Sequence, residues 1–120
     1  MRPEERDAAY LWDMLDAAST VRDFVAGVTV NQYMTDRKLQ LAVERAVEII
    51  GEAARRVSDA YKIAHPEIPW KGMIGQRHVL AHEYGEIKQE RMWAVASSHI
   101  PSLIAILGPL LPPPPSNTDK

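Results

Sequence analysis

The apolar residues from Leu39 to Tyr61 recur at steps of three and four, the longest helical pattern in the chain. A helix turns by about 100° per residue, so this spacing gathers the apolar side chains on one face. Thr35 or Asp36 can cap the first turn, and the pattern predicts a helix that continues to about Ala64. Its expected core positions are Leu39, Val43, Ala46, Val47, Ile50, Ala53, Ala54, Val57 and Tyr61.

A first helix and a short connector are predicted before this pattern, and prolines end it. Pro3, followed by two glutamates, predicts the start of a first helix that ends near Gly27. Residues 28–33 are a short connector rich in β-branched side chains, too brief for a strand without a partner. The prolines within 65–70 then end the central helix, because each disfavours helical geometry in the residue before it.

Pro69 is placed to open a third helix, which Gly85 is expected to stop. A fourth helix is expected from residue 87 or 88 to Leu107, with a kink at Pro101 where a backbone hydrogen bond is lost. Short links between four helices favour antiparallel neighbours. The sequence therefore predicts an all-α fold, an antiparallel four-helix bundle.

A chain of 120 residues is long enough for one domain with its own core. We assign residues 1–111 to that domain and residues 112–120, which begin with four prolines, to a disordered tail. There is no cysteine, which excludes disulfides and thiolate metal sites. The net charge of −2 gives no bulk positive field, so RNA would need a local basic cleft.

The first residues are charged, unlike a secretory signal, and no apolar run is expected to reach the length that crosses a bilayer. These features predict a cytoplasmic protein with no membrane partner.

The segment 77–84 (RHVLAHEY) brings together an arginine, two histidines, a glutamate and a tyrosine within about two helical turns. On a regular helix Arg77 and Tyr84 share nearly one azimuth, and His78 and His82 share another. His82 lies about 140° around the helix from Arg77. Arg77 must therefore reach around its own helix, or a second chain must complete the site.

Each of these residues also has a purely structural explanation. Arg77 could form an ion pair with Glu48 or Glu52 of the preceding helix, and the histidines could be exposed or buried with a hydrogen bond. Their grouping favours a functional site, because Gly72 and Gly75 weaken this helix and are expected to let it approach a neighbour closely.

A metal site is one alternative. His78 and His82 stand four residues apart, the spacing at which two imidazoles can hold one ion, and Glu83 or Glu48 could add a ligand. The His-Glu-x-x-His order of zinc proteases is absent.

Arg77 and His82 could instead cleave an RNA phosphodiester without a metal. A histidine with a pKa near neutrality can accept the proton of the ribose 2′-hydroxyl or protonate the leaving oxygen. A guanidinium can bind the phosphate with two hydrogen bonds and offset the charge of the transition state. The 2′-hydroxyl is then the nucleophile, so no cofactor is expected.

The pattern Arg77-x4-His82-x-Tyr84 resembles the signature of HepT toxins, a branch of the HEPN superfamily of small all-α ribonucleases. The likeness covers most of residues 3–107. It includes the segments AVEIIGEAA (46–54), PEIPW (66–70) with Gly72, and Trp93 with IPSL (100–103).

This resemblance implies a HEPN-like domain over 1–111 and a homodimer that brings two Arg–His pairs into one cleft. It also implies a partner, an MntA-type minimal nucleotidyltransferase antitoxin, that transfers AMP from ATP onto Tyr84. The chain departs from the pattern at two positions: His78 stands where relatives often have asparagine, and Gln76 where they often have methionine. His78 could serve as a second acid–base group or hold the phosphate.

We therefore expect the toxin of a type VII-like toxin–antitoxin pair, a metal-independent endoribonuclease with catalytic Arg77 and His82. His78, Glu48 and Glu52 are expected to support them, and AMPylation of Tyr84 is expected to silence the enzyme. The alternatives are a non-catalytic helical dimer that serves as partner of a nucleotidyltransferase, and a histidine-based metal-binding bundle.

Overall fold

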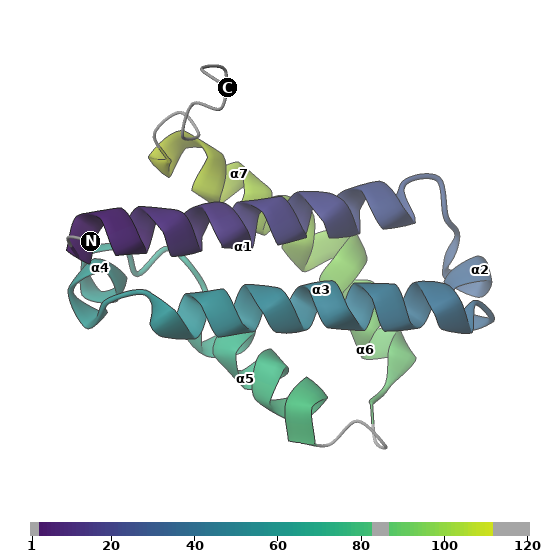
Figure 1. The fold of residues 1–120 in the computed structure, drawn as a ribbon. Helices are drawn as coiled ribbons and strands as arrows, with labels where there is room; N and C mark the ends of the chain where they lie inside the picture. Colours follow the sequence, from purple (N-terminus) through teal and green to yellow (C-terminus); the bar gives the residue numbers. More distant parts are fainter. Residues whose placement is uncertain (1–2, 83–86, 112–120) are drawn as a thin grey trace, which may run out of the picture.

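The computed structural model describes residues 3–82 and 87–111, and every regular element in these ranges is a helix (Figure 1). No strand occurs in them, which confirms the all-α prediction. The elements are α1 (Pro3–Val25), α2 (Val30–Met34), α3 (Arg37–Arg56), α4 (Asp59–Ala64), α5 (Trp70–His82), α6 (Gln89–Ala94), the π-helical turn η2 (Val95–His99) and α7 (Ile100–Leu110).

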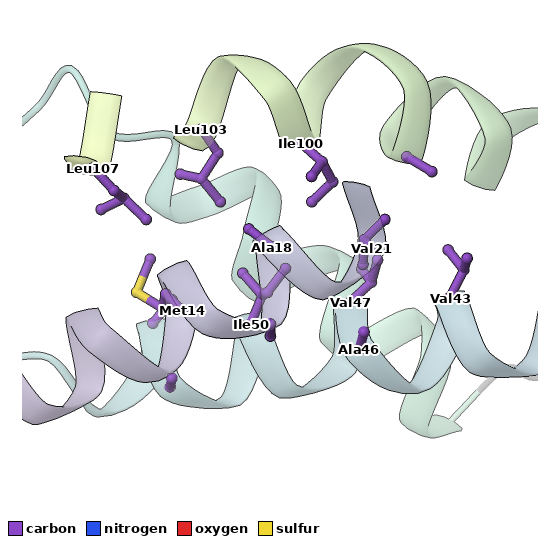
Figure 2. Close-up of a cluster of buried hydrophobic side chains, with 14 of the residues drawn as sticks. Met14, Ala18, Val21, Val43, Ala46, Val47, Ile50, Ile100, Leu103 and Leu107 are labelled. Atoms are coloured by element: carbon purple, nitrogen blue, oxygen red, sulfur yellow. The ribbon is translucent and has the colours of Figure 1, made fainter. Parts of the chain in front are cut away.

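The two longest helices, α1 and α3, lie side by side and run in opposite directions, whereas α5 and the α6–α7 helix cross them obliquely (Figure 1). The antiparallel arrangement therefore holds for the first pair. Figure 2 shows the core formed by α1, α3 and α7, whose side chains are almost inaccessible to water. These residues are Met14, Ala18 and Val21 of α1, Val43, Ala46, Val47 and Ile50 of α3, and Ile100, Leu103 and Leu107 of α7.

The segment expected as a connector contains the short helix α2. A capping box starts it: the Thr29 hydroxyl accepts a hydrogen bond from the Gln32 N–H at 3.1 Å, and the Gln32 side chain accepts one from the Thr29 N–H at 2.9 Å. The turn buries Tyr33 completely. Asp36 then caps α3 by accepting from the Leu39 N–H at 3.0 Å, one of the two caps that the sequence predicted.

The central helix ends at Arg56, earlier than the predicted Ala64. Ser58 interrupts it and caps α4, its hydroxyl accepting from the Tyr61 N–H at 3.1 Å. The carboxylate of Asp7 on α1 accepts from both the Ser58 N–H (2.9 Å) and the Ser58 hydroxyl (2.6 Å). The break is stable because Asp7 satisfies the polar groups that the interrupted helix frees.

The fourth predicted helix continues through its proline by widening one turn. The Ile100 N–H donates to the Val95 carbonyl five residues back, which makes a π turn over Val95–His99. Pro101 follows at the start of α7, directly after the wide turn. The predicted interruption at Pro101 is therefore accommodated just before the proline.

The helical stretch Gln89–Leu110 is long and apolar enough to cross a membrane, judged by length and composition alone. The expectation that no apolar run reaches that length is therefore wrong. A core helix of a soluble protein can pass the same test, but only 22% of the apolar window is buried. Its large apolar side chains are buried or half-buried, and its exposed positions are mostly small or polar residues such as Ala94, Ser98 and Gly108.

α5 packs across α3 at Gly51, which is buried in the middle of α3. A Cβ at this position would overlap the Cβ of Arg77 and lie 2.6 Å from the Met73 carbonyl oxygen, so only glycine permits the contact. Cβ atoms at Gly72 and Gly75 would meet nothing within 4 Å. The expectation that those two glycines permit the close approach is wrong, because Gly51 on the other helix does so.

Gly51→Ala should lower the free energy of unfolding by about 1–3 kcal/mol, because a methyl group would be forced into backbone and side-chain atoms of α5. Gly75→Ala is the matched control. It should raise the stability by up to about 1 kcal/mol, because alanine favours a helix and has open space there. Urea unfolding of the two variants measures both effects, and equal stabilisation by the two would contradict this packing.

Candidate active site

Arg77 lies on the face of α5 that meets α3, directly over Gly51. Its side chain is 29% exposed, and its Nε stands 3.2 Å from Oε1 of Glu52. Nε is itself buried and forms no hydrogen bond among the described residues, so the N–H does not point at the carboxylate oxygen. The contact is an ion pair that holds the guanidinium in place while leaving donors for another acceptor.

Glu52 faces three guanidinium groups at once. It accepts hydrogen bonds from Arg55 and Arg56, each at 2.9 Å, and pairs with Arg77. The hydrogen bonds from Arg55 and then Arg56 lower the pKa of Glu52 to about 2, and the charge of Arg77 adds to this effect. One carboxylate cannot neutralise three cations, so this cluster carries excess positive charge.

Glu48, the other predicted supporting acid, pairs with Arg45 at 3.3 Å. Of the two glutamates, Glu52 is the one that contacts Arg77. Glu48, Glu52 and Arg77 nevertheless line the same cavity of about 340 Å³ between α1, α3 and α5. Of the two expected ion-pair partners, Glu52 is the one that pairs with Arg77, and a supporting role for either glutamate stays a prediction.

His78 and His82 lie next to each other on the exposed surface of α5, with their ring centroids 4.7 Å apart and the planes tilted by 54°. Neither lines the cavity of Arg77. Within the described ranges no hydrogen bond, ion pair or ring contact joins either histidine to Arg77. A single chain thus presents the guanidinium and the imidazoles on different sides of one helix, as their spacing predicts.

No group of three or more histidine, cysteine, aspartate or glutamate side chains in residues 3–82 and 87–111 could hold a metal ion. Glu83, one of the proposed ligands, lies outside the described residues, as do Tyr84 and the expected stop at Gly85.

Gln89, at the start of α6, is held by a partly buried network of polar side chains that the sequence analysis did not predict. The Gln89 amide donates to Glu44 at 2.7 Å, and the Tyr33 hydroxyl donates to the Gln89 carbonyl oxygen at 3.2 Å. Burial, followed by the charge of Glu44, raises the pKa of Tyr33 to about 12. The capping box before Tyr33 was the available signal, since it turns this tyrosine inward.

The family model described as Ribonuclease HepT-like matches residues 14–110. The chain is 34% identical over 95 residues to "Putative RNase MJ1380" of Methanocaldococcus jannaschii, covering 79% of this chain and 87% of that protein. It is 37% identical over 94 residues to "Probable ribonuclease HepT" of Thermococcus cleftensis, covering 78% and 86%. No solved structure matches significantly.

The Glu52 cluster should make stability depend on pH in acid. The folded-state pKa of about 2 lies below the ordinary value of 4.5, so the stabilisation is present above pH 4.5 and is lost as the pH falls towards 2. Thermal unfolding midpoints across this window should fall less steeply in Glu52→Gln than in the wild type. Glu48→Gln is the control, since Glu48 pairs with one arginine; an equal change in both variants would show that the shared cluster has no special role.

Proposed function

The chain belongs to the HepT-like ribonuclease family, whose model covers residues 14–110, and on this premise we propose that it is a metal-independent endoribonuclease. It acts as the toxin of a type VII-like toxin–antitoxin pair in the cytoplasm. The observation that carries the proposal is the placement of Arg77. Glu52 and Gly51 fix this arginine in a cluster with excess positive charge, on the same helix as the exposed His82.

The chemistry needs one phosphate clamp and one group that transfers protons. Arg77 binds the non-bridging oxygens of the scissile phosphate, where negative charge builds up. His82 is exposed to incoming RNA and moves a proton at the 2′-hydroxyl or at the leaving 5′-oxygen. The 2′-oxygen then attacks phosphorus and the bond to the 5′-oxygen breaks. The products carry a 2′,3′-cyclic phosphate and a 5′-hydroxyl.

A homodimer would supply the geometry that one chain lacks. Two observations support it. Arg77 and His82 point to different sides of α5, and an apolar groove of about 510 Å³ lies between α3, α5 and α7, lined by residues such as Val47, Met73 and Ile106. From Met92 to Leu111 the chain contains no Asp, Glu, Lys or Arg, and apolar side chains such as Ile104 and Ile106 are only half-buried by their own chain. A second copy seated on this face would bury it and bring its own α5 beside the first.

Arg77→Ala and His82→Ala should each reduce RNA cleavage by about 10²–10⁴-fold and abolish toxicity on expression, while circular dichroism stays unchanged. Arg77→Lys should also fail, because an ammonium cannot make the planar two-bond contact. Cleavage is measured on the wild type with and without a chelator. Loss of cleavage on chelation would favour the metal-binding bundle, and no cleavage at all would favour the non-catalytic partner.

Co-expression of the two variants in one cell tests the shared cleft. A mixed dimer of Arg77→Ala and His82→Ala chains contains one intact arginine and one intact histidine on different protomers. If the site is composite, cleavage returns in the mixed dimer although each parent is inactive. If each chain works alone, the mixture stays as inactive as its parents, and a monomer by light scattering that still cuts RNA would refute the dimer.

We further propose that an MntA-like nucleotidyltransferase silences the enzyme by attaching AMP to Tyr84. Tyr84 follows Arg77 by seven residues, close to two turns, so on a continued helix the two share one side. An attached AMP would place a phosphate anion beside the Arg77 guanidinium, where it would occupy the position of the substrate phosphate. Inhibition would then need no change of fold.

Tyr84→Phe should retain most of the ribonuclease activity yet escape the antitoxin, because the phenol transfers no proton but is the acceptor of AMP. The measurement is co-expression with the transferase followed by intact-mass analysis. The wild type should gain AMP-sized increments and lose toxicity, and the phenylalanine variant should do neither. AMP on another residue, or an inactive variant before any transferase is added, would contradict this assignment.

A further inference from the structure

The cavity that contains Arg77 extends well beyond that residue. It occupies about 340 Å³ and is formed by Tyr10 and Asp13 of α1, Arg45, Ile49 and Arg56 of α3, and Arg77 of α5, with neighbouring α3 side chains. A volume of this size falls at the lower end of the range of roughly 300–1,000 Å³ found for small-ligand pockets. It therefore has room for one nucleotide next to the proposed phosphate clamp.

The α3 wall of this cavity carries Arg45 and Arg56 together with Glu48 and Glu52, and the α1 wall carries Asp13. Arg45 donates from one nitrogen to Glu48, and Arg56 bonds with Glu52 and with the Tyr10 hydroxyl, which leaves further guanidinium donors for a ligand. On the α1 side stands the Asp13 carboxylate, which forms no hydrogen bond or ion pair within the described part of the chain. Partial burial, and then the charge of Asp16, raise the pKa of Asp13. A hydrogen bond donated by a ligand would stabilise the ionised form of the Asp13 carboxylate.

We propose that the cavity is a subsite for a guanine nucleotide of the RNA substrate, next to the scissile phosphate. The inference rests on the proposed ribonuclease function, because Arg77 both lines this cavity and is the residue proposed to bind the scissile phosphate. Arg45 and Arg56 contact the phosphate of the bound nucleotide. The Tyr10 ring and the Ile49 side chain offer surfaces to its base, as is usual in recognition of single-stranded RNA.

Guanine is selected by the unpaired Asp13 carboxylate. Its Watson–Crick edge carries two adjacent donors, N1–H and the N2 amino group, which match the two oxygens of one carboxylate. Adenine and cytosine present one amino donor beside a ring-nitrogen acceptor, which would repel the second oxygen. Uracil presents one imino donor between two carbonyl acceptors. A carboxylate at this wall therefore discriminates by hydrogen-bond pattern, with no need for a different shape of cavity.

The test uses the full-length protein and the four 5′-mononucleotides, titrated at millimolar concentration and followed by protein-detected NMR. Wild type should bind 5′-GMP most tightly, with shifts centred on Tyr10 and Asp13. Asp13→Asn should weaken 5′-GMP by about tenfold or more, the discrimination that one two-bond contact to a base supplies, and leave the other three nucleotides nearly unchanged.

Two control variants separate base recognition from charge. Asp16→Asn removes the same charge from the next turn of α1 but lies outside the cavity, so the preference for 5′-GMP should persist. Arg45→Gln should weaken all four nucleotides alike, because it acts on the phosphate. These side chains are exposed, and a circular dichroism spectrum identical to wild type confirms the fold of each variant.

The proposal is overturned if no nucleotide binds, if 5′-GMP binds no better than the others, or if Asp13→Asn and Asp16→Asn change binding in the same way. Mononucleotide binding does not depend on catalysis, so the two proposals fail separately. A guanine preference in a protein that cuts no RNA would retain the subsite and refute the ribonuclease. RNA cleavage without any guanine preference would retain the ribonuclease and refute the subsite.

Discussion

The contact between the backbones of α3 and α5 at Gly51 determines most of what the candidate site can do. A glycine at this crossing lets Arg77 lie flat against α3, where a single added methyl group would overlap it. Glu52, the next residue of α3, then stands beside the guanidinium at 3.2 Å. The same crossing therefore sets both the position of the arginine and the carboxylate that orients it. A shift of α5 by the width of one methyl group would change both together, because packed helices move as rigid elements.

The charge balance around Glu52 explains how a chain with net charge −2 can attract RNA. Arg45, Arg55, Arg56 and Arg77 gather here with only three carboxylates among the described residues, those of Asp13, Glu48 and Glu52, which leaves one positive charge in local excess. Exposed charges farther apart than about 8 Å are largely screened at physiological salt, so a phosphate at this cluster responds mainly to the local excess of cations. A pKa of about 2 for Glu52 has the same origin, since the surrounding guanidinium groups stabilise its ionised form. The positive electrostatic potential at this site comes from the local arrangement of the arginines and not from the composition of the chain.

Sequence periodicity predicted the long helices well because their apolar stripes are regular, and the four-residue spacing of His78 and His82 predicted their contact. It failed where a local cap competes with that period. Val57 and Tyr61 continue the apolar stripe of α3, which hid the break at Ser58, although a serine before an aspartate is a helix start signal. The capping box of α2 was also present in the sequence but was masked by β-branched neighbours. Arg77 pairs with Glu52 and not with Glu48, and the helices cross at Gly51 and not at Gly75. Both contacts depend on how α3 and α5 are rotated relative to each other, which the pattern of one helix does not specify.

The motif helix is covered sparsely by its own chain, and this has a consequence for how the site works. Of the α5 residues Trp70–His82, Leu80 is the one that is buried, and two glycines lower the intrinsic stability of this helix. A segment with so few buried contacts opens more easily than the α1–α3 core, so its geometry is set by whatever else packs against it. A second chain on the apolar groove and an RNA phosphate on Arg77 would both order the same helix. Each would then favour binding of the other, because the second ligand meets a helix that the first has already ordered.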